Sequence, residues 1–504
     1  MNILFRWFLV ISLSVFASAA WTAEAKTGKA GDFDFAKTVA RDLAAAPFQA
    51  PLPLPKALRD LDYDQMRCIN FDSRQAVWRQ ENLPFQLMFF HPAGIANDQI
   101  RVHLVDAAGV KDFPFSRRLF EYGRPELVNL DVESVQFSGF RLNFPLNKPD
   151  KFDELIVFQG ATYFRALSRN LFYGLSARTL TVNCGGPGAE EFPRYREFWI
   201  YRPAKGDQQI RVVGVFDGPS IAGAADFVIK PGEETLMECR VALFARVDIA
   251  HYGIAPLTSM YWFGKTRPGR FDDYRPEVHD SDGLLLQDRQ GDWLWRTLDN
   301  DGRLRWSAFP GTGIRGFGLM QRERAYTSYQ DFEALYHRRP SAWVRPLGEW
   351  GEGTLRLLEL PAHTEYQDNI VAFWEPAQPL KAGKSIEFAY QLSWLRDRPD
   401  LPATGRLLQA RSYGVQGDAS RRHFLLEFAW PGMETRPDVQ PEIVVTATHG
   451  AIKKQTVVFN PYTYAWRISF EAVAENPTTP MEMRAVVRQN GVACTETWNY
   501  SWIP

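Results

Sequence analysis

The chain has 504 residues, of which 45% are hydrophobic and 23% charged, and its formal net charge is −1. This balanced charge, without any run of Lys or Arg, excludes the basic stripe that nucleic-acid binding needs, so we expect no nucleic-acid partner. Aromatic residues reach 14%, and such an excess of rings suits flat ligands such as sugars, whose C–H faces stack on aromatic planes.

The first 25 residues predict a secretory signal peptide. Arg6 precedes an apolar run over residues 7–20, and small residues at 17–19 and 23–25 offer candidate cleavage sites. The run is short for a membrane span and no twin arginine is present, which favours the general (Sec-type) export route. An uncleaved anchor helix is the alternative.

Four cysteines are widely spaced along the chain: Cys68, Cys184, Cys239 and Cys494. They allow three pairings, and the sequence does not choose among them. No CxxC pair is present, so we expect neither a metal nor another cofactor, and we predict that Cys494 is a free, buried thiol.

The region up to residue 340 predicts mostly strands. A first helix is expected to begin at a capping Asp34 and to stop at Pro47. Short alternating stretches broken by turn residues follow from about 68 to 260, as is typical of sheet sandwiches or barrels. Residues 329–340 (YQDFEALYHRRP) predict a helical interlude.

A linker is expected at residues 375–384, which contain Pro and Gly without clear periodicity. Beyond it, WRISFEA (466–472) alternates apolar and polar residues, and Asn490-Gly491 predicts a type I′ hairpin turn. The remaining length suits an immunoglobulin-like sandwich. The predicted organisation is therefore all-β, with a large domain over 26–378 and a smaller one over 387–504.

Residues 272–283 (DDYRPEVHDSDG) hold five carboxylates, namely Asp272, Asp273, Glu277, Asp280 and Asp282. All five cannot be buried and ionised together, because like charges in a low dielectric raise one another's pKa. A solvated loop ending in an Asp-Gly turn is one interpretation. A calcium loop is a second, although the full ligand pattern is missing. A cleft loop that supplies a catalytic carboxylate is the third.

The surrounding composition favours the cleft loop. Seven of the sixteen tryptophans fall between positions 262 and 374, together with many arginines: Trp262, Trp293, Trp295, Trp306, Trp343, Trp350 and Trp374. Aromatic faces, arginine forks and acids together are what a carbohydrate cleft requires. For any single tryptophan, core packing remains the better explanation.

A second acidic segment, HTEYQDNIVAFW (363–374), places Glu365 and Asp368 before an apolar strand. A carboxylate at the mouth of a strand, beside Trp374, suits a general acid that must deliver a proton to a leaving oxygen. A turn at Asp368-Asn369 is the structural alternative. Motifs for serine hydrolases, P-loops, zinc proteases and dinucleotide binding are not found.

Several long strings resemble the MdoG/OpgG/OpgD family of periplasmic proteins for osmoregulated glucans. They are YFRALSRNLFYGLSARTL, EEFPRYREFWIYRP, GIAPLTSMYWFG, DDYRPEVHDSDGL, RGFGLMQRERAYTSYQDFEALYHRRPSAWV and DNIVAFW. The likeness runs from about residue 32 to the C-terminus. It implies a periplasmic location and a large galactose-mutarotase-like β-sandwich joined to a smaller immunoglobulin-like one.

The resemblance also implies an activity on β-1,2-glucan, because some members are inverting endo-glucanases. The alternatives are a glucan-binding scaffold without cleavage, and a transglycosylase or cyclising enzyme. Contact with the membrane glucan synthase machinery is a further implied partnership. The lack of a twin-arginine signal leans towards the G type over the D type of the family.

Site residues follow from the same resemblance. Asp368 matches the general acid and Asp280 the proposed general base, while Tyr336 and Glu365 match cleft supports that relay protons. Gln367 stands where typical members carry Asn. We further expect substrate contacts from Trp262, Trp343, Trp374, Asp282, Arg275 and Glu277, the last two either binding sugar hydroxyls or holding Asp280.

Overall fold

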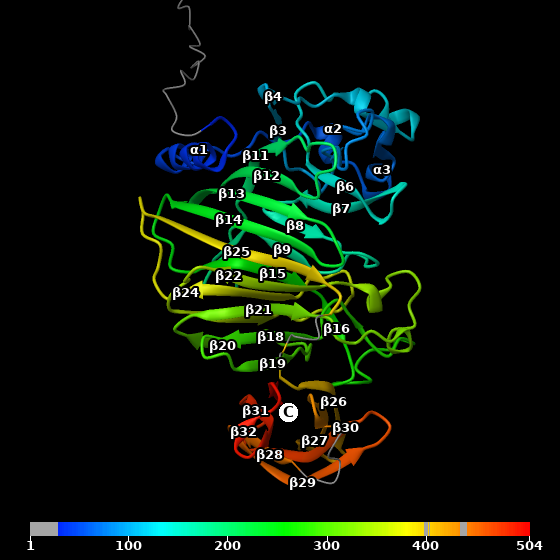
Figure 1. Ribbon diagram of the computed structural model, residues 1–504, viewed down its shortest axis with the longest axis vertical. Helices are drawn as coiled ribbons and strands as arrows, with labels where there is room; N and C mark the ends of the chain where they lie inside the picture. The colour runs from blue at the N-terminus through cyan, green and yellow to red at the C-terminus, as the bar shows by residue number, and fades with distance from the viewer. Residues whose placement is uncertain (1–28, 398–401, 403, 434–440) are drawn as a thin grey trace, which may run out of the picture.

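The computed structural model describes residues 29–397, 402, 404–433 and 441–504 (Figure 1). The signal peptide predicted for residues 1–25 lies outside these ranges. Within them strands predominate over helices, which confirms the all-β prediction. No helix in the described ranges is both long and apolar enough to cross a bilayer.

One sheet, called here the short sheet, contains the strand that follows Asp368 in the chain. Within the described ranges its path runs β2 (Gln86–Phe90), β6 (Gly139–Lys148), β7 (Lys151–Gln159), β8 (Tyr163–Ala166), β9 (Ser176–Arg178), β15 (Tyr252–Ser259), β24 (Ile370–Pro376), β23 (Gly353–Glu359) and β20 (Arg305–Gly311). A short strand, β10 (Leu180–Val182), also pairs with β15.

A second, long sheet packs against the short sheet. Over the described residues its path runs β28 (Glu442–Ala447), β31 (Met481–Gln489), β33 (Thr497–Trp502), β19 (Trp293–Thr297), β18 (Gly283–Asp288), β21 (Ile314–Met320), β22 (Ser341–Leu347), β25 (Ser385–Leu395), β14 (Thr235–Ala245), β13 (Ile221–Lys230), β12 (Ile210–Asp217), β11 (Arg194–Tyr201), β3 (Arg101–Asp106) and β4 (Gly109–Asp112). β32 (Val492–Ala493) pairs with β31.

Smaller elements complete the fold. In the described part of the chain two strand pairs stand apart from the large sheets: β1 (Ile69–Phe71) pairs with β5 (Phe120–Tyr122), and β16 (Tyr261–Phe263) with β17 (Val278–His279). The short helices are α2 (Lys56–Arg59), α3 (Tyr63–Met66), and the 3₁₀ turns η1 (Ser73–Gln75), η2 (Arg117–Leu119), η3 (Pro125–Leu127), η4 (Tyr326–Ser328) and η5 (Tyr336–Arg338).

The main core lies between the two large sheets, and strand alternation decides which residues enter it. On β24, Ile370, Ala372 and Trp374 belong to this core, while Val371 and Phe373 lie in a separate small cluster. Successive side chains of a strand point to opposite faces. The outer face of the short sheet is therefore separate from the main core, and on it Val371 and Phe373 pack with Cys184.

Helix α1 (Phe33–Ala45) covers the opposite side of the long sheet, beside β11 to β14 (Figure 1). Its apolar side packs with residues such as Trp199 and Val213. The predicted helix is confirmed, but its cap is Asp32, whose side chain accepts from the backbone N–H of Phe35. Asp34 instead lies in the first turn, where a carboxylate is also favourable.

The C-terminal strands form a second packed unit at the far end of the molecule, beyond β19 (Figure 1). Within the described residues a four-stranded sheet, β26 (Arg406–Val415), β27 (Asp418–Ala429), β30 (Ala465–Ala474) and β29 (Gly450–Asn460), faces β28, β31 and β33. The alternation predicted for 466–472 is confirmed in β30. Asn490 and Gly491 both have positive φ, as a type I′ turn requires.

The linker lies later than residues 375–384. β25 (Ser385–Leu395) pairs with β14 on one side and β22 on the other, so it belongs to the long sheet. The four-stranded sheet begins only at Arg406. We therefore place the division between Leu395 and Arg406, while β33 pairs with β19 in parallel and joins the two units through the long sheet.

The helical interlude predicted for residues 329–340 is wrong. The segment contains only the short turn η5, preceded by η4. Gln330 and Leu335 have φ values of 53° and 50°, which interrupt any continuous right-handed helix. The carboxylate of Asp331 accepts from the backbone N–H groups of Glu333 and Ala334, which stabilises the turn.

The four cysteines, all within the described residues, are free. Cys184 and Cys239 are buried, whereas Cys68 and Cys494 are half-buried. Cys494 is thus a free thiol as predicted, but it is less buried than expected, and its thiol donates to the carbonyl of Val487 at 3.3 Å.

Candidate functional site

Asp280 directly follows β17 and is nearly enclosed, with 4% of its surface exposed. Its backbone N–H donates to the carbonyl of Met260 at 2.8 Å. Its Oδ1 lies 2.8 Å from the Arg339 guanidinium, as an ion pair without hydrogen-bond geometry, and has no hydrogen-bond donor among the described residues. Asp280 therefore presents an unused acceptor inside the protein.

Burial raises the pKa of Asp280 to about 6, although the charge of Arg339 acts against this shift. The negative charge of Asp368 raises the pKa of Asp280 further. The structure thus brings these two acids, 88 positions apart in sequence, within electrostatic range of each other.

Asp368 is exposed and lies just before β24. The next residue, Asn369, is buried and fixes this position: its Oδ1 accepts from the backbone N–H of Tyr261 at 2.8 Å, and its Nδ2 donates to the carbonyls of Tyr261 and Leu360 at 3.0 Å each. No described residue forms a hydrogen bond or ion pair with the Asp368 carboxylate. The chain therefore holds Asp368 by its neighbour and leaves its carboxylate open to a ligand.

Tyr336 and Glu365 form a link next to Asp280. The Tyr336 hydroxyl donates to Oε2 of Glu365, and the guanidinium of Arg339, the partner of Asp280, lies 4.6 Å from the centre of the Tyr336 ring. Burial raises the pKa of Tyr336, and the bond to Glu365 and the charge of Asp280 raise it further. Tyr336 thus remains a proton donor next to two carboxylates.

Arg275 does not contact Asp280. Its guanidinium donates to Asp273 at 2.8 Å, to Asp331 at 2.9 Å and to Glu365 at 2.8 Å. One carboxylate from the same loop and two from distant segments thus converge on one half-buried cation. Its role in this structure is to hold Glu365 in place under Tyr336.

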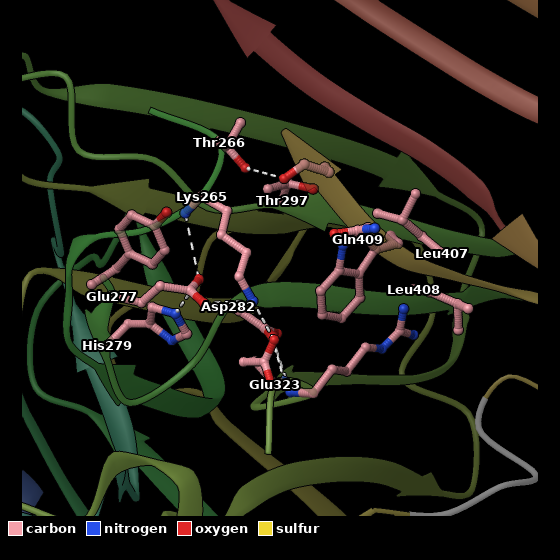
Figure 2. Close-up of a pocket in the computed structure, with 14 residues that line it drawn as sticks. Lys265, Thr266, Glu277, His279, Asp282, Thr297, Glu323, Leu407, Leu408 and Gln409 are labelled. Atoms are coloured by element: carbon pink, nitrogen blue, oxygen red, sulfur yellow. Dashed lines mark hydrogen bonds and ion pairs between the residues drawn. The ribbon is translucent and has the colours of Figure 1, made fainter. Parts of the chain in front are cut away.

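Glu277 and Asp282 line a different cavity, of about 60 Å³, between the 272–283 loop and the start of β26 (Figure 2). Glu277 pairs with Lys265 at 2.7 Å and lies 3.4 Å from the Nε2 atom of His279. Asp282 accepts from the backbone N–H groups of Arg322 and Glu323 at 3.0 Å. The substrate contact expected for Glu277 and Asp282 is therefore not supported.

His279, fully buried in this cavity wall, connects the cavity to Asp280 through the backbone of β17. Burial would lower the pKa of His279, but the hydrogen bond and charge of Glu277 raise it above its ordinary value. The acid-rich loop is thus solvated only in its first half, at Asp272 and Tyr274, while Glu277 and Asp280 are buried. Among the described residues no cluster of His, Cys, Asp or Glu is grouped to hold a metal ion.

Of the three tryptophans expected to contact substrate, two lie in hydrophobic cores and one lies near Arg275. Trp374 is 1% exposed in the main core and Trp343 is 5% exposed beside Trp293, so neither presents a ring face to a ligand. These two substrate-binding assignments are corrected to core packing. Trp262 is half-buried, against Phe271 and within 5.8 Å of the Arg275 guanidinium.

Three exposed aromatic side chains near Arg275 were not among the substrate-binding residues predicted from the sequence. Tyr274, Phe332 and Tyr366 are 76%, 80% and 90% exposed. Each is the chain neighbour of a residue in the Arg275 cluster, in the pairs Asp273-Tyr274, Asp331-Phe332 and Glu365-Tyr366. This repeated pair of an acid followed by an aromatic residue is the sequence pattern from which the three exposed rings could have been predicted.

Further unpredicted residues extend the site over the outer face of the short sheet. The charge of Asp368 contributes to raising the pKa of Tyr163, mainly a burial effect, to about 12. The Tyr163 ring lies 4.5 Å from the Arg178 guanidinium, which donates to Glu190 at 2.6 Å. An acid, an aromatic ring and a guanidinium group thus lie near one another, a combination that carbohydrate-binding sites use.

A pH-dependent stability difference is expected for Asp280→Asn. Because the pKa of Asp280 is raised to about 6, the folded protein keeps this proton when the unfolded chain has lost it. The contribution of protonated Asp280 to the free energy of unfolding is fully present below about pH 4 and is lost as the pH rises through 6. The stability of wild type relative to Asp280→Asn should fall by about 2 kcal/mol over this range. Denaturant unfolding of both proteins between pH 4 and 7 measures it, and a pH-independent difference would contradict the shift.

A family model and several known proteins match nearly the whole chain. Residues 32–502 match the family model described as "Periplasmic glucan biosynthesis protein, MdoG". The chain is 39% identical over 497 residues to glucans biosynthesis protein G of Bradyrhizobium diazoefficiens, with 98% of each chain covered. It is 41% identical over 482 residues to the protein of that name from Vibrio cholerae, covering 95% of this chain and 88% of the relative. The chain therefore belongs to the MdoG family of periplasmic glucan biosynthesis proteins.

Proposed function

We propose that this protein is exported to the periplasm and acts there on the β-1,2-glucan backbone as an inverting endo-glucanase. The observation that carries this proposal is the pairing of two acids in contrasting environments. Asp280 is enclosed with an unused acceptor and a raised pKa, and the exposed Asp368 is close enough to contribute to that pKa. Pairs of acids whose environments differ are typical of acid–base catalysis.

In this mechanism Asp368 is the general acid. Its proton passes to the glycosidic oxygen as the bond from that oxygen to the anomeric carbon breaks. The carboxylate is unpaired and fixed through Asn369, so a glucan chain can approach it without displacing a protein partner.

Asp280 is the general base. It accepts the proton of a water whose oxygen attacks the anomeric carbon from the face opposite Asp368. Tyr336 and Glu365 provide a second route, in which the water's proton passes to Tyr336 as Tyr336 passes its own to Glu365. The hydrogen bond between the Tyr336 hydroxyl and Glu365 already has the direction that this relay needs.

A non-catalytic glucan scaffold is the second candidate, favoured by the name glucans biosynthesis protein G of the relatives. It would use the same aromatic and guanidinium groups to guide a growing polymer, in contact with the membrane synthase machinery. A transglycosylase would use the same acids, with a sugar hydroxyl in place of water.

Incubation of the purified mature protein with linear β-1,2-glucan separates these functions. We expect shorter linear products with new reducing ends, each first released in the inverted anomeric configuration. Cyclic products would indicate the transglycosylase. Binding without any change in product size would contradict the hydrolase and support the scaffold.

A further inference from the structure

A second cavity, of about 210 Å³, opens at the opposite end of β24 from Asp368. It is larger than the roughly 150 Å³ apolar cavity that accepts a benzene ring. Its lining combines ring faces with charged and polar groups: Tyr252, Trp306 and Phe373, with His251, Arg356 and Glu375. The acids of the proposed reaction are not part of this lining.

Trp306 contributes a partly exposed ring to this cavity, with the Arg356 guanidinium 6.0 Å from the ring centre. It is 41% exposed and is the one tryptophan among the large exposed hydrophobic side chains of the described residues. Its ring edge lies against Gly185, where a Cβ atom would come within 2.1 Å of Cζ2, and Gly185 has a φ of 60°. Any larger residue at 185 would displace the ring, so the backbone is shaped to hold Trp306 in this orientation.

The polar groups of the cavity are fixed by one carboxylate. Glu375 accepts from Nδ1 of His251 at 2.8 Å and from Nε of Arg356. The other ring nitrogen of His251 and the terminal nitrogens of Arg356 have no hydrogen-bond partner among the described residues. These groups are thus oriented and available for the hydroxyls of a ligand that stacks on Trp306, the arrangement expected for a sugar.

A chain of side-chain contacts connects the cavity with the residues near Asp368. Arg178, which contacts Tyr163 near Asp368, also pairs with Glu190 at 2.6 Å. Cys184 lies beside Glu190, and it packs with Phe373 of the cavity wall. Along β24 the separation between its first residue and Glu375 is about 17 Å, at about 3.3 Å per residue.

We propose that this cavity is a distal subsite that binds a glucosyl unit of the same β-1,2-glucan chain whose bond is broken at Asp368 and Asp280. The proposal rests on the proposed function for the identity of the sugar. Its consequence is a dependence on chain length, since only a glucan that spans the outer face of the short sheet can occupy both places. Short oligosaccharides that bind only near Asp368 and Asp280 do not reach Trp306, so Trp306 does not contribute to their binding.

Trp306→Ala tests this subsite, with kcat/KM compared on long linear β-1,2-glucan and on the shortest oligosaccharide that wild type cleaves. We expect a fall of about tenfold on the long substrate and less than twofold on the short one. Trp306→Phe, which keeps a ring, should recover most of the loss. Tyr462→Ala removes a ring that is 94% exposed in the C-terminal unit and serves as the matched control.

Equal losses on both substrates, or no loss on either, would overturn the subsite. If Trp306→Ala fails to fold, His251→Ala, which removes a half-exposed side chain, takes its place with the same expected length dependence. Affinity for long glucan, measured by tryptophan fluorescence, separates this proposal from the hydrolase. A wild type that binds without cleaving, together with weaker binding by the variant, would retain the subsite and reject the hydrolase.

Discussion

Asp368→Asn is expected to lower the turnover of linear β-1,2-glucan by about 10²–10⁴-fold, the usual contribution of general acid–base catalysis. Asn is nearly isosteric with Asp, but it cannot deliver a proton to the departing oxygen. Because no described residue is paired with the Asp368 carboxylate, the fold and glucan affinity should change little. Reducing-end formation measures turnover, and calorimetric titration measures affinity.

The matched control is Asp272→Asn, which removes an exposed carboxylate from the acid-rich loop that supplies Asp280. It should retain wild-type turnover within a factor of about two, since an exposed carboxylate outside the site has no role in bond breaking. Turnover by Asp368→Asn within tenfold of wild type would reject Asp368 as the acid. Loss of glucan binding in that variant would instead indicate a binding role.

Arg275→Leu is expected to destabilise the protein by about 1–3 kcal/mol, the cost of leaving partly buried hydrogen-bond acceptors without their donor. The change leaves Asp273, Asp331 and Glu365 without their shared cation. Arg275 also lowers the pKa of Asp273, mainly through their hydrogen bond. Denaturant unfolding at neutral pH measures the loss, and turnover should fall as well because Glu365 is no longer held under Tyr336.

Arg289→Leu provides the comparison for Arg275. The Arg289 side chain is 53% exposed and lies 3.7 Å from an even more exposed Glu349, so its removal should cost less than about 1 kcal/mol. Similar losses for Arg275→Leu and Arg289→Leu would show that the three-carboxylate cluster contributes no special stability. A stable Arg275→Leu variant with normal turnover would also remove Glu365 from the mechanism.

The sequence predicted individual strands better than it predicted which strands pair with one another. Alternation in β30 and the Asn490-Gly491 turn follow from local chemistry, and both are present. The position of the linker depends on β25 pairing with β14 and β22, which lie far away in sequence and leave no local signal in residues 375–384. The helix expected at 329–340 failed for a similar reason, because turn contacts override its apolar spacing.

The site was predictable only in part. Composition indicated an acid, arginine and aromatic cleft, and the family resemblance indicated which two acids to pair, but neither revealed the direction of each side chain. Glu277 and Asp280 lie three positions apart, yet only Glu277 lines the cavity of Figure 2, whereas Asp280 pairs with Arg339 beyond the end of β17. Trp374 faces the core by strand alternation, whereas Trp306, which no motif singled out, faces solvent.

The most direct test of the two-acid site is a crystal structure of Asp368→Asn with linear β-1,2-glucan bound. We expect one glycosidic oxygen within hydrogen-bond reach of the substituted amide at position 368. A water should lie on the opposite face of the adjoining sugar ring, linked to Asp280 directly or through Tyr336 and Glu365. A glucan chain bound away from position 368, or a wall of protein between the sugar and both Asp280 and Tyr336, would contradict it.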